Sequence, residues 1–380
     1  MLKQLLVVIS FMFSLACKGQ GGYENLHNRI CEIIETYDAI GASVAVVKEN
    51  RICYQQSFGY HSCENYLDRR DTIPSDGIFR IASISKTFVA TAIMQLAERE
   101  LLSLDDDINK YLHFEVRSPL FPQEMITVRM LLSHLSGITD FEYGKHRNSL
   151  SMFSSLDSLE KQQFFTKYKP GSKFNYSNYG YNLLGAIIEN VTQKRFDQYI
   201  KENILTPLAI QGSYDVSVLD SAKFVWSYQY DNKRNRYVKA LKAYQPIGEK
   251  LEHYVLGEST AVFSPCGGMK ITIEDLARFM MAHMNYGTLD GNKILSKESE
   301  EEMMKIVSHN YGLGFMHSSF KLKNVDMVGH QGGAYGFHGS MFFSPDGKYG
   351  FIVLCNGCKG GHKLDSEIVR VLYHHFINKE

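Results

Sequence analysis

The sequence has no excess of charge of either sign. Its 380 residues carry 41 basic and 41 acidic side chains, so the formal net charge is zero. That balance argues against a nucleic-acid binder that relies on a general basic field. Intrinsic disorder requires low hydrophobicity together with high net charge, whereas 44% of the residues are apolar. The sequence also contains no internal repeat and no low-complexity tract, which leaves a globular enzyme or binding protein.

No apolar run is long enough to cross a membrane, since a transmembrane helix needs about 20 such residues. A shorter run, residues 5–13, follows Lys3 and is typical of an export signal. We expect residues 1–16 to be a signal peptide and residues 17–22 to be a flexible tether.

Two interpretations of the cleavage after Ala16 fit this signal. Ser14-Leu15-Ala16 has the small residues of an ordinary signal-peptidase site. The same residues followed by Cys17 resemble a bacterial lipobox, in which Cys17 becomes the lipidated first residue. The sequence therefore predicts an exported protein, periplasmic or anchored to the outer membrane, whose membrane contact is a lipid on Cys17.

Cysteine is scarce, with seven in the whole chain. Cys355-x-x-Cys358 is a lone pair with His362 nearby, whereas a zinc site requires four ligands in paired clusters. The pattern favours ordinary core or surface cysteines, and we expect neither a metal nor a cofactor. The sequence does not decide whether disulfides form, because an exported protein permits them and a chain of this length does not need them.

The spacing of apolar residues predicts strands together with a helix near each end of the chain and a largely helical middle. The expected helices are 24–37, 83–100, 127–135, 179–192, 273–284 and 365–376. The expected hairpins are 42–48 with 52–58 and 341–344 with 349–354, and residues 223–250 are expected to form an elaborated loop or a hairpin.

This order predicts an α+β fold, in which an antiparallel sheet is flanked by helices and carries an inserted, mostly helical lobe. We expect one domain over residues 23–380. The sheet lobe would comprise residues 23–80 and 258–380, and the helical lobe residues 81–257.

The first candidate site is Ser83-Ile-Ser-Lys86, at the start of an apolar helical segment. A serine and a lysine three residues apart lie on one face of a helix. A desolvated lysine can accept the serine proton, and a helix N-terminus stabilises a developing oxyanion. The alternative is that Ser83 only caps the helix. Ser-x-x-Lys also begins at Ser158 and Ser318, so this pattern alone leaves both interpretations open.

The second candidate site is Tyr176-Ser-Asn178, in a turn just before a predicted helix. Tyr176 is suited to general acid or base chemistry beside a lysine. Asn178 is suited to donating to a substrate carbonyl and to orienting that lysine. The alternative is a capped helix start with a packed tyrosine.

The third candidate site is His330-Gln-Gly332-Gly333, ahead of the second hairpin. Glycines allow a ligand to lie against a strand backbone, and the N–H groups of Gly333 and Ser83 would form an oxyanion hole. The segment does not match a dinucleotide-binding fingerprint, because it follows no strand-to-helix signal and lacks the acidic residue about 20 positions on. The alternative is a structural histidine in a glycine-rich turn.

Taken in order, Ser-x-x-Lys, Tyr-Ser-Asn and His-x-Gly resemble the serine β-lactamase and penicillin-binding-protein superfamily. Tyr-Ser-Asn in place of Ser-Asp-Asn resembles its class C-like branch of β-lactamase-related serine hydrolases. The flanking segments 126–137, 179–185 and 264–279 are similar to that branch as well. The resemblance covers residues 23–376 and implies a β-lactamase/transpeptidase-like fold.

The resemblance implies a role for each motif residue. Ser83 would be the acylated nucleophile, and Lys86 would accept its proton. Tyr176 would pass protons to the leaving group and from the deacylating water. His134 and Asp275 also match family motifs, and we interpret them as scaffold.

The same resemblance places Asn178 against the substrate amide or ester, and His330 and Gly332 along the pocket. The amides of Ser83 and Gly333 would be the oxyanion donors. The lactamase pattern has a lysine at the position of His330, whereas histidine has an unperturbed pKa near 6.5 and is largely neutral at pH 7. This departure argues against efficient β-lactam hydrolysis, because His variants resemble the family's esterases, D-residue peptidases and acyltransferases.

Three functions remain open from the sequence. A hydrolase would form an acyl-Ser83 intermediate on an ester, an amide or a D-amino-acid peptide. An acyltransferase would pass the same acyl group to a hydroxyl or amine acceptor, after the same first half-reaction. A non-catalytic penicillin-binding or cell-wall sensor is the third, and the combination of Ser83, Lys86 and Tyr176 argues against it. The expected partner is a small-molecule or peptide acyl substrate.

Overall fold

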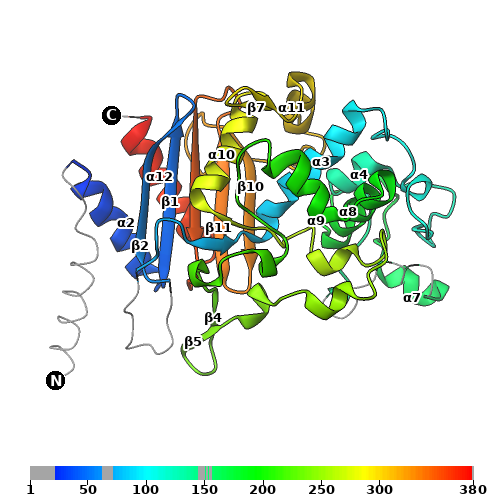
Figure 1. Cartoon of the computed structure of the whole chain (residues 1–380), viewed down its shortest axis with the longest axis horizontal. Coiled ribbons are helices and arrows are strands. Elements are labelled where there is room, and N and C mark those ends of the chain that lie inside the picture. Colours follow the sequence, from blue (N-terminus) through cyan, green and yellow to red (C-terminus); the bar gives the residue numbers. More distant parts are fainter. Residues whose placement is uncertain (1–21, 62–71, 144–149, 151–152, 154–155, 379–380) are drawn as a thin grey trace.

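A six-stranded antiparallel sheet organises the molecule (Figure 1). Its order is β2-β1-β12-β11-β10-β9, so strands from the two ends of the chain pair with each other. The strands are β1 (Gly41–Lys48), β2 (Arg51–Gly59), β9 (Met316–Ser318), β10 (Met327–Ala334), β11 (Phe337–Phe343) and β12 (Tyr349–Cys355). Both predicted hairpins are present, and the predicted α+β class is confirmed.

The computed structural model describes residues 22–61, 72–143, 150, 153 and 156–378. The predicted signal peptide and nearly all of the predicted tether, including Cys17, lie outside these residues. Within the described ranges, every helix is too short or too polar to span a lipid bilayer.

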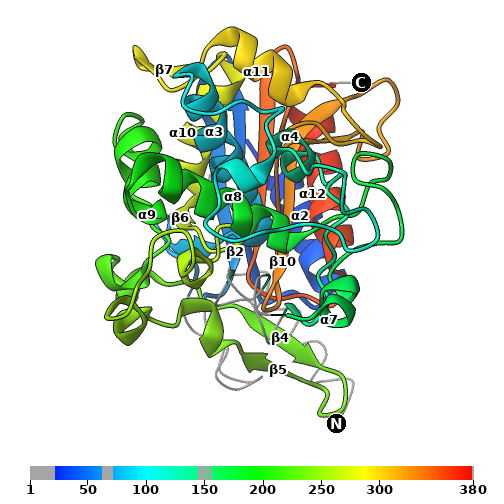
Figure 2. The same cartoon turned by 90° about the vertical axis from the view of Figure 1, so that its right-hand side faces the viewer.

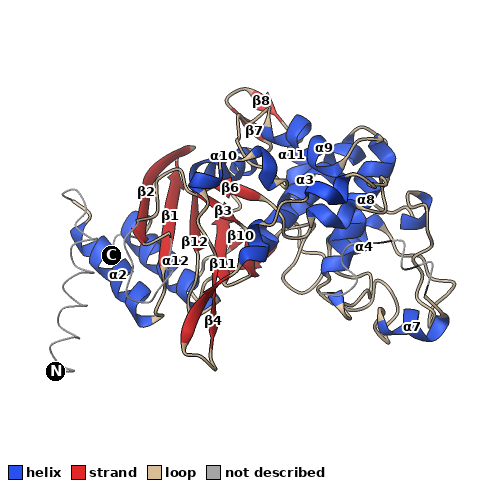
Figure 3. Cartoon of the chain, turned by 60° about the horizontal axis from the view of Figure 1, so that its bottom comes forward, coloured by secondary structure: helices blue, strands red, loops and turns tan. Residues whose placement is uncertain are grey.

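Both faces of the sheet are buried, because successive side chains of its strands point into two different cores. Val44 and Val46 of β1 face the core that contains α2 (Glu24–Thr36) and α12 (His362–Phe376). Ala45 and Val47 of the same strand face the larger core, which includes α10 (Ile273–Met284). Figure 3 shows α2 and α12 together on one side of the sheet and α10 on the other.

The helices from the middle of the chain, together with α11, gather on the same side of the sheet as α10 (Figure 2). They are α3 (Ser85–Glu98), α4 (Val128–Leu132), α7 (Ser158–Gln163), α8 (Asn178–Thr192), α9 (Phe196–Ile200) and α11 (Lys297–Met304). All residues of α3 from Ser85 to Leu96 are buried, including the polar side chains of Ser85, Lys86, Thr87, Thr91 and Gln95. This rigid central helix carries the residues that follow Ser83.

Three two-stranded sheets complete the structure: β3 (Ile78–Arg80) with β6 (Lys270–Thr272), β4 (Tyr228–Asp231) with β5 (Arg236–Lys239), and β7 (Thr288–Leu289) with β8 (Asn292–Lys293). The β4–β5 hairpin falls within the segment predicted to be a loop or hairpin. It lies at the end of the main sheet, where the Tyr228 N–H donates to the Asn356 carbonyl at 2.8 Å. The lobe boundaries at residues 81 and 257 stay a prediction.

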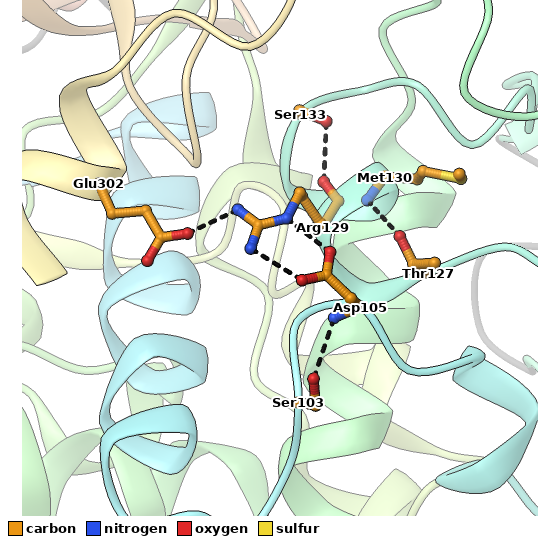
Figure 4. A network of polar contacts seen from close by, with 7 residues as sticks. All are labelled: Ser103, Asp105, Thr127, Arg129, Met130, Ser133 and Glu302. Carbon is orange, nitrogen blue, oxygen red and sulfur yellow. Dashed lines mark hydrogen bonds and ion pairs between the residues drawn. The ribbon is translucent and has the colours of Figure 1, made fainter.

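Arg129 ties α4 to two distant segments (Figure 4). Its guanidinium donates to both carboxylate oxygens of Asp105, at 2.7 and 3.2 Å, and to Glu302 of α11 at 2.7 Å. Thr127 accepts a hydrogen bond from the Met130 N–H at 3.2 Å and so caps the helix start. The helix predicted over 127–135 ends at Leu132, because His134 has a left-handed φ of +58°.

Candidate active site

Ser83 lies in a tight turn immediately before α3. The 3₁₀ turn Ala82–Ile84 holds it, and Ala82 has a φ of +46°. A left-handed conformation at a residue with a side chain costs about 1–2 kcal/mol, so the turn is locally strained. Neither the turn nor α3 has a side-chain cap hydrogen bond, so Ser83 does not serve as a helix cap. The hydroxyl is instead presented at the positive end of a buried helix.

Lys86 is fully buried and touches three oxygen atoms. Its Nζ lies 2.8 Å from Asn178 Oδ1, 2.9 Å from the Cys266 carbonyl and 3.2 Å from Ser83 Oγ. The first two oxygens can only accept hydrogen bonds, so they hold two N–H groups of the amine. The remaining direction points at the serine hydroxyl. In the neutral amine this direction carries the lone pair, which is the geometry of a base for Ser83.

Asp140 orients Asn178, and the motif analysis missed it. One carboxylate oxygen accepts from the backbone N–H groups of Asn178 (2.7 Å) and Tyr179 (3.2 Å) at the start of α8. The other accepts from Asn178 Nδ2 at 2.7 Å, which turns the amide oxygen toward Lys86. Ser177 completes the helix start as the N-cap, accepting from the Gly180 N–H at 3.1 Å. Asp140 therefore acts on Lys86 through Asn178.

Tyr176 packs against Lys86 and is 37% exposed. Its ring centroid is 4.8 Å from Lys86 Nζ and 4.3 Å from the ring of His134. His134 Nδ1 accepts from the Ser177 N–H at 3.1 Å, and burial lowers the pKa of His134 well below its ordinary value. His134 is therefore a neutral packing surface for Tyr176, in keeping with the scaffold role expected for it.

His330 is in the middle of a strand, β10, so the interpretation of a histidine in a glycine-rich turn was wrong. The ring is 2% exposed, and burial, together with the charge of Lys86, lowers its pKa to about 3. Nδ1 lies 2.5 Å from the Gln331 carbonyl, which can only accept, so Nδ1 carries the proton. Nε2 is then the acceptor for the Tyr311 hydroxyl at 2.8 Å. Both ring nitrogens thus have protein partners, and the ring is neutral.

Gly332 lets β10 approach the Ser83 turn. A Cβ at this position would lie 2.4 Å from the Ile81 carbonyl oxygen and 3.3 Å from the Ser83 backbone nitrogen. Only glycine permits that approach. The neighbouring Gly333 is exposed, and β9 pairs with β10 over Met327–Gly329 only. The edge of β10 beyond residue 330 therefore faces the site, where the predicted oxyanion donors, the amides of Ser83 and Gly333, belong.

The family model for Beta-lactamase matches residues 26–374. The chain belongs to this family. The resemblance to the serine β-lactamase and penicillin-binding-protein superfamily is thereby confirmed, and the family is one of serine hydrolases with the β-lactamase fold.

Two curated relatives of this Beta-lactamase family protein are similar to it over most of its length. It is 26% identical to Protein flp of Staphylococcus aureus (strain MRSA252) over 342 residues, covering 88% of this chain and 62% of that protein. It is also 26% identical to Penicillin-binding protein 4* of Bacillus subtilis (strain 168) over 330 residues, covering 83% of this chain and 67% of that one. The chain therefore spans less than two thirds of the length of flp.

Solved structures share the fold. The octameric penicillin-binding protein homologue from Pyrococcus abyssi superposes with a TM-score of 0.72 at 26% identity, covering 92% of this chain and 77% of that chain. A D-stereospecific amidohydrolase from Streptomyces sp. superposes with a TM-score of 0.66 at 23% identity, covering 92% and 98%.

In this family member, the structure brings together Ser83, Lys86 and Asn178 by direct contacts, with Tyr176 against the same lysine. Sequence reasoning missed Asp140, Tyr311 and the carbonyl of Cys266. Each acts through a tertiary contact and belongs to no short motif. Among the residues that the structure describes, no group of three His, Cys, Asp or Glu side chains is arranged to hold a metal ion.

Proposed function

We propose that the protein is an exported serine hydrolase that forms an acyl-Ser83 intermediate on an ester, an amide or a D-amino-acid peptide. The observation that carries the proposal is the contact of Lys86 Nζ with Ser83 Oγ at 3.2 Å, while two carbonyl oxygens hold the other N–H groups. A lysine held in this way is aimed at one proton, that of the serine hydroxyl.

The proposed reaction has two halves. In acylation, Lys86 takes the hydroxyl proton as Ser83 Oγ attacks the substrate carbonyl carbon, and the N–H groups of Ser83 and Gly333 stabilise the oxyanion. Tyr176 passes a proton to the departing alkoxide or amine. In deacylation, water attacks the acyl carbon, gives up a proton through Tyr176 and Lys86, and releases the acid with Ser83 restored.

The state of His330 favours esters and amides over β-lactams. A neutral imidazole with both nitrogens engaged offers no cation to a substrate carboxylate. Two structural neighbours support D-amino-acid amides as the first class to try: the D-stereospecific amidohydrolase from Streptomyces sp. and the D-amino acid amidase from Ochrobactrum anthropi SV3.

Export through residues 1–16 and lipidation of Cys17 are part of the proposal. Cys31 is in a disulfide, which supports an oxidising compartment. Metabolic labelling with a fatty acid should mark the full chain and leave Cys17→Ala unlabelled. If the wild-type protein is cleaved after Ala16 but stays unlabelled, the proposal of a lipoprotein is wrong and the protein is exported without a lipid anchor.

The hydrolase is tested on a panel of chromogenic esters and of L- and D-amino-acid amides. We expect turnover by the wild type and by Ser318→Ala, whose serine begins another Ser-x-x-Lys, and none by Ser83→Ala. Equal activity of Ser83→Ala would refute the proposal. Product analysis with an added amine or alcohol separates the two catalytic functions: the acid alone identifies a hydrolase, and a new amide or ester identifies an acyltransferase.

A further inference from the structure

Two cysteines that the proposed reaction does not use lie together at the end of β12. Cys355 is the last residue of this strand and is completely buried, and Cys358 follows three residues later at 8% exposure. Both are free thiols that lie close enough to interact with each other, and Cys358 Sγ also donates to the Gly361 carbonyl at 3.8 Å. The Cys-x-x-Cys pattern seen in the sequence is therefore a real pair in space.

The surroundings make the two thiols unequal. The interaction with Cys355 lowers the pKa of Cys358, burial opposes this, and the backbone at Gly361 and Gly360, just before α12, lowers the pKa further. The same contact and complete burial raise the pKa of Cys355 well above its ordinary value. Cys358 is thus the better thiolate, and Cys355 is the thiol that keeps its proton.

Cys358 is the more accessible of the two thiols, with 8% of the residue exposed against none of Cys355. Cys358 lines a cavity of about 440 Å³, together with Gly333 and His338 of the main sheet and Tyr230 of the β4–β5 hairpin. Cys355 is completely buried in the sheet, where it pairs with Ala42 of β1 and His338 of β11. An incoming disulfide would therefore meet Cys358 first.

We propose that Cys355 and Cys358 form a reversible disulfide in which Cys358 is the entry thiol. The Cys358 thiolate attacks one sulfur of an external disulfide, such as glutathione disulfide, and a glutathione thiolate leaves. Cys355 then loses its proton and attacks Cys358 Sγ, which releases the second glutathione. Two protein thiols are oxidised, and one external disulfide is reduced to two thiols. The step makes no use of Ser83.

The test exposes the full chain to glutathione disulfide and maps cysteine peptides by mass spectrometry. We expect the peptide with both cysteines to lose two hydrogens and to recover them with dithiothreitol. Cys355→Ser should accumulate glutathione on Cys358, because the resolving thiol is absent, and Cys358→Ser should leave Cys355 unmodified. Cys53→Ser, which removes a free thiol in β2, should behave as the wild type.

Circular dichroism verifies that each variant is folded. Should a serine variant fail to fold, alkylation of the native wild type decides, with Cys358 expected to react well before Cys355. Absence of the Cys355–Cys358 linkage under excess glutathione disulfide, or alkylation of Cys355 first, would overturn the proposal. Since the readout is thiol chemistry alone, either result leaves the hydrolase proposal intact.

Discussion

At the scale of single residues, the chemistry depends on the three contacts of Lys86. Lys86→Ala removes the amine that touches Ser83 Oγ, so we expect acylation by an activated ester to slow by about 10²–10⁴-fold. Stopped-flow measurement of the acylation burst checks this, with Lys161→Ala on α7 as the control that should keep the wild-type rate. A loss of less than about tenfold would assign the role of base to Tyr176 instead.

The buried, neutral state of His330 predicts an effect on stability. Its pKa is about 3 in the folded protein and near 6.5 when unfolded, so between these values only the unfolded state holds the proton. The contribution of this histidine is therefore complete above pH 6.5 and is lost as the pH falls toward 3, at about 1.4 kcal/mol per pH unit.

Urea unfolding of the wild type and His330→Asn between pH 7 and pH 4 measures this effect. The free energy of unfolding of the wild type should fall relative to that of the variant as the solution is acidified. Parallel curves for the two proteins would show that the folded histidine titrates normally.

At the scale of elements, β10 must lie against the Ser83 turn. Gly332→Ala would place a Cβ 2.4 Å from the Ile81 carbonyl oxygen, so we expect it to push the strand away and to reduce acylation by about 10²-fold, the size of effect seen when one oxyanion donor is lost. Gly333→Ala is the matched control. It keeps its N–H, and the nearest atoms to its Cβ would belong to side-chain rings, that of His362 at 3.2 Å and that of His338 at 3.4 Å. Equal acylation rates for the two variants would contradict this account of β10.

Two substitutions at the start of α8 should lower the free energy of unfolding by similar amounts, while only one of them should slow acylation. Asp140→Ala and Ser177→Ala each remove hydrogen bonds to the first N–H groups of the helix, so each should cost about 1–2 kcal/mol of unfolding free energy. Only Asp140→Ala also frees the Asn178 amide that holds Lys86. Denaturant unfolding and acylation rates are measured together, and a similar rate loss in both variants would show that Asp140 acts only as a cap.

Elements with a strong local signal were predictable from the sequence. The period of the apolar residues located α10 and α12, and turn residues located both hairpins. The helix predicted from Ser83 begins instead at Ser85, because Ala82 adopts a left-handed conformation that no propensity indicates. The strand bounds around His330 were not predicted, although its glycines suggested a strand backbone beside a ligand, because glycine-rich segments have low strand propensity and β10 is held by its neighbours in the sheet.

At the scale of the whole molecule, the two ends of the chain form the main sheet, and its middle forms the helices that pack beside the active site. The pairing of β1 with β12 joins Ala42 to Cys355, and no local signal predicts such a partner. This dependence on long-range contacts also explains why the sequence revealed the catalytic motifs but not the residues that hold them in place. Ser83, Lys86 and Tyr176 carry chemistry in short patterns, whereas Asp140 and Tyr311 reach the site only after the fold brings distant segments together.

The central claim is that Ser83, activated by Lys86, carries the acyl group. Reaction with a serine-reactive fluorophosphonate, followed by peptide mass spectrometry, tests it most directly. The account predicts one adduct on Ser83, none in Ser83→Ala and a strongly slowed reaction in Lys86→Ala. An unlabelled Ser83 in the folded wild type, or an adduct on another serine at equal rate, would contradict it.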